Sequence, residues 1–226
     1  MSVRLVVAKY RESVEWTKSI KHAVTIYDKS DLPVEGSIPL KNIGREGETF
    51  LHHIITNYET LDDVTVFLQG NPFEHLQLLV GWRAKLTPEE QARVCEKVNT
   101  EITSDSPFSS FYQVRYNDPN GTNGADTKSA CKKYYGAEYD WFTVVPGAQY
   151  IVPKSYILSR PLEFWKRLRD GFHSGDLNGY AQEQLWWLAY RHSMDYTNVR
   201  DHDSEKAKVL NNLYGFHNTP TSIYLA

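Results

Sequence analysis

The amino-acid sequence predicts an α/β fold in which helices flank a mixed, mainly parallel β-sheet. Strand-like and helix-like segments alternate in its first part, which is the pattern of a doubly wound sheet. Two polar segments that contain glycine, Asn42-Ile43-Gly44-Arg45-Glu46 and Gln69-Gly70-Asn71-Pro72, stand at a helix start and at a strand end. These are the places where such a sheet presents backbone N–H groups and side chains to a ligand.

The first part of the chain is predicted to contain three strands and one helix. Residues 3–9, 22–28 and 63–69 are strand-like because they are rich in apolar and β-branched side chains. Residues 46–58 place their apolar side chains at helical spacing. Residues 30–41 contain two prolines and a glycine, so we expect a loop there.

The second part is predicted to be mainly helical. We expect helices over residues 73–79, from Thr87 to about residue 98, over 160–169 and over 180–192, with Pro88 and Pro161 as start signals. Residues 141–152 predict a pair of strands interrupted at Pro146 and Gly147. Residues 117–128 form the strongest predicted loop, either a mobile lid or a plain surface loop. The tail from residue 195 is polar, with a short helix near 206–213.

Composition limits the classes of function. The chain has 226 residues, 13% of them aromatic, and a net charge of −3, which argues against a strongly electrostatic grip on nucleic acid. Cys95 and Cys131 show neither metal-ligand spacing nor a disulfide framework, which favours a reducing compartment. We see no signal peptide and no apolar run of about 18 residues that could span a membrane. We therefore expect a soluble, cytoplasmic protein.

Candidate ligand-binding residues follow the predicted strands, because the carboxyl ends of parallel strands face the ligand crevice. An aspartate there suits ribose hydroxyls or a base edge, and a guanidinium suits phosphate. The candidates are Lys9, Tyr10, Arg11, Asp28, Gly44, Arg45, Glu46, Gln69, Gly70 and Asn71. Together they predict a pocket for a nucleotide diphosphate. Each also has a structural interpretation: Asp28 as a turn cap, Arg45 in an ion pair, and Glu46 as a partner of the helix dipole.

Several motifs resemble those of a family of uncharacterised, mainly fungal and viral proteins. The family's N-x-G-R-E element matches residues 42–46, and its F-L-Q-G-N-P element matches residues 67–72. Residues 51–54, 146–150 and 157–164 match it as well, and residues 183–186 read Glu-Gln-Leu-Trp where the family has E-R-L-W. The resemblance covers about residues 3–190. The Gly-Arg-acid element is also similar to the G-R-D of rhamnan-synthesis-type proteins.

The resemblance implies a GT-A-like (Rossmann-like) glycosyltransferase that uses a nucleotide sugar as its co-substrate. It implies one domain over residues 1–226, with a nucleotide-binding half (1–80), an acceptor half (81–194) and a C-terminal tail (195–226). By position, Asp28, Gly44, Arg45 and Glu46 would line the donor site. Related enzymes hold Mn²⁺ or Mg²⁺ with an Asp-x-Asp element, but this chain has Gln69-Gly70-Asn71 there. Since a hard cation prefers anionic oxygens, we assign no metal ligand; Glu74 and His75 are the nearest substitutes.

The acceptor side is assigned to the second half of the chain. Gly147, Ala148 and Gln149 follow a predicted strand and would let an acceptor approach the backbone. Glu183 is the candidate general base, since transfer requires a carboxylate that takes the acceptor hydroxyl's proton. Trp186 could stack the acceptor, although such a residue is more often part of the core. Glu183 could equally be a surface residue of its helix.

Two alternatives to a glycosyltransferase remain open. The first is a non-catalytic protein that binds a sugar or a nucleotide, which the missing Asp-x-Asp favours. The second is a metal-dependent hydrolase that uses Asp28, His52, Glu74 and His75. The sequence leaves the acceptor open, and a glycan, a lipid-linked sugar, a protein or a modified base in viral DNA would all be compatible.

Overall fold

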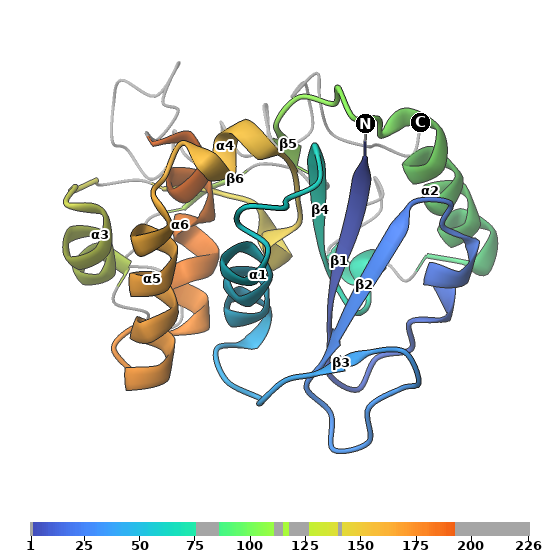
Figure 1. Ribbon diagram of the computed structural model, residues 1–226, viewed down its shortest axis with the longest axis horizontal. Helices are drawn as coiled ribbons and strands as arrows, with labels where there is room; N and C mark the ends of the chain where they lie inside the picture. Colours follow the sequence, from blue (N-terminus) through green and yellow to red (C-terminus); the bar gives the residue numbers. More distant parts are fainter. Residues whose placement is uncertain (1, 76–85, 111–114, 118–126, 140–141, 193–226) are drawn as a thin grey trace.

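A six-stranded sheet forms the centre of the computed structural model, which describes residues 2–75, 86–110, 115–117, 127–139 and 142–192 (Figure 1). The strand order is β3-β2-β1-β4-β8-β5. The strands are β1 (Val3–Lys9), β2 (Ala23–Asp28), β3 (Ile38–Pro39), β4 (Val64–Gln69), β5 (Ser109–Ser110) and β8 (Tyr150–Pro153). β1 to β4 run parallel, whereas β8 is antiparallel to both β4 and β5. The predicted α/β fold with a mixed, mainly parallel sheet is therefore confirmed.

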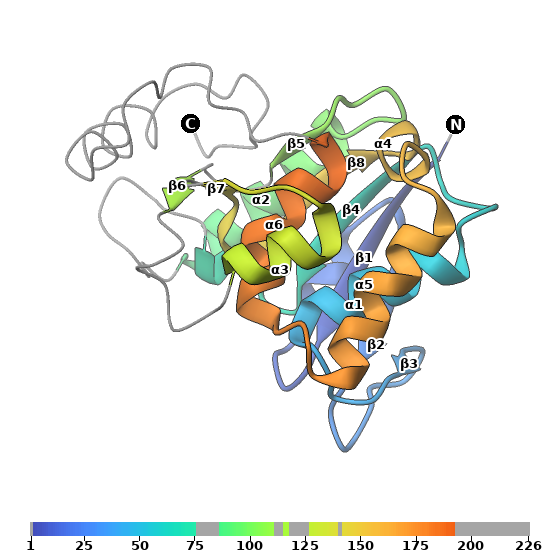
Figure 2. The same ribbon diagram turned by 90° about the vertical axis from the view of Figure 1, so that its left-hand side faces the viewer.

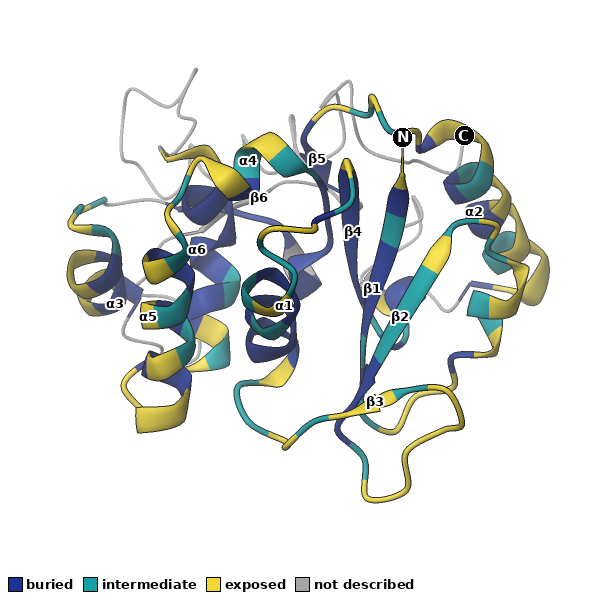
Figure 3. Cartoon of the chain, in the orientation of Figure 1, coloured by how far each residue is buried: buried dark blue, intermediate teal, exposed yellow. Residues whose placement is uncertain are grey.

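Helices cover both faces of this sheet. Figures 1 and 2 show α1 (Arg45–Thr56), α3 (Thr127–Tyr135), α5 (Leu162–Ser174) and α6 (Gly179–Arg191) on one side, and α2 (Pro88–Glu101) on the other, beside the 3-10 turn η1 (Glu15–Ser19). Leu5, Val6 and Val7 are all 0% exposed although their side chains alternate between the two faces. Figure 3 shows β1, β4 and the inner faces of the helices largely buried, whereas much of β2 is intermediate and β3 is exposed.

The long predicted elements are confirmed, and the differences concern short ones. α2 begins at a capping box in which Thr87 and Glu90 bond to each other's backbone N–H groups. The predicted loop 30–41 contains the two-residue strand β3, and η1, α3 and α4 (Lys154–Leu158) were not predicted from the sequence. β7 (Phe142–Val144) does not pair with β8, because it joins β6 (Arg115–Asn117) in a second sheet.

Some predictions fall outside the described residues. The predicted helix 73–79 appears as the 3-10 turn η2 (Pro72–His75), and its continuation lies outside the described part. The same is true of most of the predicted loop 117–128 and of the tail from residue 195 with its short helix. Within the described ranges, no helix combines the length and the apolar character that a membrane span requires.

A buried cluster of charges joins the end of β2 to α1 and α5. The Lys29 ammonium lies 3.0 Å from Glu48 Oε2, and both side chains are 4% exposed. Lys29 also donates to the carbonyl oxygens of Ile43 and Arg45, at 2.5 and 2.6 Å. From α5, Arg169 Nε lies 3.1 Å from Glu48 Oε1. This cluster therefore fixes the start of α1 against its neighbours.

Replacement of Glu48 should destabilise the fold strongly. A Glu48→Gln variant keeps the shape of the side chain but leaves the buried Lys29 ammonium without its carboxylate, which should cost about 3 kcal/mol of unfolding free energy. The matched control is Glu163→Gln, because Glu163 is 77% exposed in a surface pair with Lys166 and should change stability by less than about 0.5 kcal/mol. Urea unfolding of both variants measures the difference, and equal losses would contradict a structural role for Glu48.

Candidate functional site

The carboxyl ends of the parallel strands and three other segments meet at one edge of the sheet. β1, β2 and β4 all end there, since Lys9 pairs with Asp28 and Ala8 pairs with Gln69. The 3-10 turn η3 (Pro146–Ala148) adjoins the end of β4, and Gln149 Nε2 donates to the carbonyl of Pro72 at 3.2 Å. The starts of α1 and α6 complete this edge. The structure therefore brings together segments that the sequence assigned separately to donor and acceptor.

Five residues form what we call the two-glutamate site: Arg45 and Glu46 on α1, Gly147 in η3, and Tyr180 and Glu183 on α6. The amide of Gly147 donates to Glu183 Oε1 at 2.7 Å. Arg45 Nε lies 3.8 Å from Glu46 Oε2, and its guanidinium carbon lies 4.7 Å from the centroid of the Tyr180 ring, which is a cation–π distance. A guanidinium, an amide donor and two carboxyl groups thus gather in one place.

The backbone at this site is unusual in two segments. Gly44 and Arg45 have φ values of 62° and 54°, and Gly147 and Ala148 have φ values of 75° and 52°. Among the described residues other than glycine, only His192 shares this left-handed region with Arg45 and Ala148. A side chain in that region strains the backbone, and such strain often marks functional sites. Both strained segments border the two-glutamate site.

Close helix packing explains the glycines around Arg45. A Cβ atom on Gly44 would lie 2.6 Å from Phe172 Cδ1, and one on Gly47 would lie 2.9 Å from Phe172 Cζ. On α6, a Cβ atom on Gly179 would lie 2.9 Å from Arg45 Cδ. The missing side chains let α1 approach α5 and α6 closely. This approach carries Arg45 and Glu46 to Tyr180 and Glu183.

The electrostatics of the site centre on Glu46. Its side chain is 9% exposed, and burial together with the nearby charge of Glu183 raises the pKa of Glu46 from 4.5 to about 7. Arg45 and Lys29 lower this pKa without offsetting the rise. At neutral pH, Glu46 therefore exists in both protonation states. The site can accept or release a proton in the pH range where most enzymes work.

Asp28 and Lys9 do not suit the predicted contact with a donor. They form an ion pair of 2.8 Å and are 0% and 6% exposed. Burial alone would raise the pKa of Asp28, but hydrogen bonds from Lys9, Ser30 and the Val34 amide lower it to about 2. Both carboxylate oxygens accept hydrogen bonds or form ion pairs inside the protein. Asp28 therefore caps the turn that follows β2, which is the structural interpretation of this residue and not the donor contact.

The segment after β4 is engaged in local contacts. The carbonyl of Gly70 accepts a hydrogen bond from Trp16 Nε1 at 2.9 Å, and Asn71 Oδ1 accepts one from the Phe73 amide at 3.3 Å. A Cβ atom on Gly70 would lie 3.2 Å from the Cα of Lys9, so glycine permits the close approach to β1. Gln69 is half-buried at the strand end.

After β1, the exposed Arg11 lies over the ring of the half-buried Tyr10, with 4.8 Å between its guanidinium carbon and the ring centroid. No ion pair ties Arg11 to a carboxylate among the contacts of the described residues. Its charge is therefore presented at the surface after β1. The prediction that Tyr10 and Arg11 contact a donor stays a prediction.

Three of the predicted acceptor residues, Trp186, Gln149 and Ala148, lie in the interior. Trp186 is 1% exposed and stacks on Tyr190 at 5.3 Å between ring centroids, so its ring belongs to the core and presents no face to an acceptor. Gln149 is 0% exposed. Ala148 is also 0% exposed, and its amide donates to the carbonyl of Val145 at 3.0 Å. Of the acceptor segment, Gly147 contacts the predicted base directly.

The histidines of α1 pack against the sheet. His53 is 3% exposed, and burial lowers its pKa to about 4; His52 is half-buried, and both rings contact Tyr27 at 5.8 and 5.3 Å. In the described part of the chain, no group of three or more His, Cys, Asp or Glu side chains is placed to hold a metal ion. Glu74 is exposed in η2.

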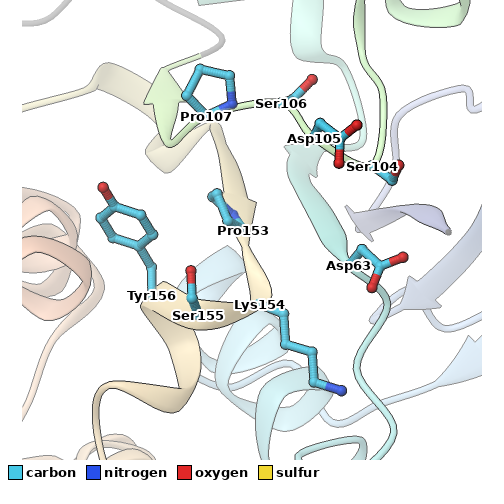
Figure 4. A pocket seen from close by; sticks show the side chains of 9 residues that line it. All are labelled: Asp63, Ser104, Asp105, Ser106, Pro107, Pro153, Lys154, Ser155 and Tyr156. Carbon is cyan, nitrogen blue, oxygen red and sulfur yellow. The ribbon is translucent and has the colours of Figure 1, made fainter.

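A pocket of about 430 Å³ lies at the opposite end of the sheet (Figure 4). Asp63 lines it from the segment before β4, Tyr156 from α4, and Asp105 from the loop before β5. The remaining lining residues are Ser104, Ser106, Pro107, Pro153, Lys154 and Ser155. None of the sequence-predicted site residues lines this pocket, so we place the functional site at the other edge.

Tyr180 is the one residue of the two-glutamate site that sequence reasoning missed. It is 44% exposed although it is large and aromatic. A signal was available, because Tyr180 precedes Glu183 by one helical turn and therefore shares its face of α6. Asn178 caps this helix by accepting a hydrogen bond from the Ala181 amide at 2.8 Å, which fixes its first turn.

Comparison with known proteins shows the family. The model of a family of proteins of unknown function, DUF3431, matches residues 5–207, and the chain belongs to this family. No curated protein matches the chain. Among solved structures, a CMP:2-keto-3-deoxy-manno-octonic acid synthetase complexed with CTP is similar at 10% identity and a TM-score of 0.35, with 84% of this chain and 87% of that chain covered.

The stability of the protein should depend on the protonation of Glu46. Because folding raises the pKa of Glu46 from 4.5 to about 7, its contribution is fully present below pH 4.5 and is lost as the pH rises to 7. Relative to a Glu46→Gln variant, the wild type should lose roughly 3 kcal/mol of unfolding free energy over this range. Urea unfolding at several pH values tests this. The exposed Glu59→Gln serves as control, and parallel curves for wild type and Glu46→Gln would refute it.

Proposed function

We propose that this DUF3431 protein is a glycosyltransferase that moves a sugar from a nucleotide-diphosphate donor to an acceptor hydroxyl. One observation supports this most: a half-exposed guanidinium and a fixed carboxylate meet at the carboxyl edge of the parallel sheet. The Arg45 side chain is 52% exposed, and Glu183 is held by the Gly147 amide at 2.7 Å. α/β sheets bind their ligands at this edge.

The donor diphosphate is assigned to Arg45 and the start of α1. A guanidinium pairs with phosphate through two parallel hydrogen bonds, and the N-terminus of a helix adds N–H groups and a positive dipole. Tyr180 is 44% exposed beside Arg45 and offers a flat face to the base or the sugar. Residues 1–80 would then supply most donor contacts, and residues 81–194 the acceptor contacts and the base.

Glu183 is assigned the role of general base. Its carboxylate takes the proton of the acceptor hydroxyl as that oxygen attacks the anomeric carbon. The bond between the anomeric carbon and the diphosphate oxygen breaks, and its electron pair leaves with the nucleoside diphosphate. Arg45 stabilises the charge that develops on the leaving group. The Gly147 amide holds Oε1 of Glu183, and the other oxygen is assigned to take the proton.

Charge neutralisation is assigned to Arg45 rather than to a divalent ion. Mn²⁺ and Mg²⁺ prefer carboxylate oxygens, whereas Gln69 and Asn71 offer amides where related enzymes have acids. Arg45 already lies at the site where a diphosphate would sit against α1. Transfer should therefore proceed in the presence of a chelator.

A thermal-shift screen of nucleotide sugars tests the donor site. At a hundredfold excess over its Kd, a ligand stabilises a protein by about 2.7 kcal/mol, which corresponds to a rise in Tm of roughly 5–10 °C. Arg45→Ala should abolish this rise, since it removes the phosphate contact. Lys18→Ala is the control, because Lys18 is 73% exposed in a surface pair with Glu15 and should leave the rise unchanged. Release of nucleoside diphosphate, with and without Mn²⁺, then measures turnover. If no donor raises the Tm and no donor is cleaved to release nucleoside diphosphate, the proposal is refuted.

A further inference from the structure

We propose that the ring of Tyr180 stacks on the sugar of the donor, and that Tyr180 selects a neutral pyranose rather than a nucleobase. This inference rests on the proposed function and deepens it, because it decides between the two groups that the flat face of Tyr180 could contact. Tyr180 lies in the first turn of α6, and Arg45 lies at the start of α1. A residue that contacts the transferred sugar determines which donors the protein accepts.

The exposure of Tyr180 is unusual for a side chain of its kind. Tyr180 is 44% exposed, and it is the only aromatic residue among the exposed large hydrophobic residues of the described part of the chain. An aromatic side chain left in water forgoes the burial by which such rings stabilise a fold. Its place beside Arg45 at the carboxyl edge of the sheet therefore points to contact with a ligand.

The ring of Tyr180 is held by its helix and by Arg45. Asn178 caps α6 through the Ala181 amide at 2.8 Å, which fixes the turn that carries Tyr180. The guanidinium carbon of Arg45 lies over the ring, 4.7 Å from its centroid. Gly179 makes room for this contact, because a Cβ atom there would lie 2.9 Å from Arg45 Cδ. With the guanidinium over one face, the other face and the edge of the ring are left for a ligand.

The order of groups in a nucleotide sugar disfavours the base as the partner of Tyr180. The sugar is bonded directly to the diphosphate, whereas the ribose separates the base from the diphosphate. The diphosphate is assigned to Arg45, whose guanidinium carbon lies only 4.7 Å from the centroid of the Tyr180 ring. The group on Tyr180 is therefore one that adjoins the diphosphate, which is the sugar or the ribose.

Glu183 decides between the sugar and the ribose. It follows Tyr180 by three positions on α6, so both side chains lie on the same face of the helix, with about 5–6 Å between their Cβ atoms. The proposed general base must lie next to the anomeric carbon, because it takes the proton of the hydroxyl that attacks this carbon. The anomeric carbon belongs to the sugar. Tyr180 thus stands beside both the diphosphate and the reacting carbon, which is the position of the sugar.

The charges around Tyr180 favour a neutral pyranose. A pyranose presents carbon-bound hydrogens on one face, and this apolar face packs on an aromatic ring. Arg45 is the only cation among the residues of the two-glutamate site, and its charge is assigned to the diphosphate. A carboxylate on the sugar would meet the carboxylate of Glu183 without a cation to balance it, so an acidic sugar should bind more weakly.

Calorimetric titration of nucleotide sugars and of their own nucleoside diphosphates tests the stacking. The probes are UDP with UDP-glucose and GDP with GDP-mannose. Tyr180→Ala should weaken binding of the nucleotide sugar by about tenfold and leave the affinity for the nucleoside diphosphate within about twofold, because only the sugar loses its stacking face. Tyr180→Phe keeps the ring and should bind both ligands as the wild type does. Leu158→Ala is the matched control, since Leu158 is 41% exposed on α4, and it should change neither affinity.

The outcomes separate this inference from the proposed function. Equal losses for both ligands in Tyr180→Ala would overturn the sugar contact, because Tyr180 would then serve only to hold Arg45. Saturation-transfer NMR of the bound nucleotide sugar adds a second measurement. In Tyr180→Ala the sugar protons should lose their signal and the base protons should keep theirs, and the reverse pattern would overturn the inference. Wild type that binds none of these probes would refute the donor site and the proposed function with it.

An acidic sugar on the same nucleotide tests the preference for a neutral pyranose. UDP-glucuronate differs from UDP-glucose by one carboxylate, and GDP-mannuronate differs from GDP-mannose in the same way. The acidic member of the pair that binds should bind the wild type about tenfold more weakly, and Glu183→Gln should reduce this difference. Equal affinity of the wild type for the neutral and the acidic donor would overturn the preference and leave the stacking on Tyr180 to the titrations above.

Discussion

The buried ammonium of Lys29 determines where α1 begins, and the arrangement of the site depends on it. It joins Glu48 on α1 to the backbone carbonyls of Ile43 and Arg45, so it holds the first turn of the helix and the segment before it at the same time. Burial of an ion pair costs desolvation energy that a hydrophobic pair would not require. The pair instead fixes positions, because one ammonium holds the Glu48 carboxylate and the carbonyl groups of Ile43 and Arg45 in place.

This geometry explains the tight turn of the Gly-Arg-Glu element. With the first turn of α1 anchored, the chain must enter the helix through a left-handed backbone, at φ values of 62° and 54° for Gly44 and Arg45. Glycine tolerates this conformation, but arginine does not favour it. The hydrogen bond from Lys29 to the Arg45 carbonyl holds the backbone in this conformation. The same turn points the guanidinium toward Tyr180 rather than into the protein.

The sequence allowed the long elements and the edge of the sheet to be predicted, since hydrophobic periodicity and capping signals are local. It did not reveal α3, whose residues 127–135 include three lysines and show little apolar pattern. At the site, the charge of a residue was a less reliable predictor of ligand binding than hydrophobic periodicity was of helices and strands. Asp28 and Lys9 are charged residues at strand ends, as a ligand site requires, but they are 19 positions apart and neutralise each other inside the fold. Such pairing depends on the tertiary structure and leaves no local signal in the sequence. The same holds for the burial of Trp186 in the core.

The contrast between two buried glutamates of α1 separates structure from function. Glu48 has Lys29, Arg169 and His173 around it. Burial alone would raise its pKa, but Lys29 and Arg169 lower it, so the charge of Glu48 contributes to stability. Glu46, two positions earlier, is almost as buried, and burial together with the charge of Glu183 raises its pKa. A glutamine of the same shape would remove this cost without leaving an unpaired cation. A carboxyl group that lowers stability at neutral pH is better explained by proton transfer than by packing.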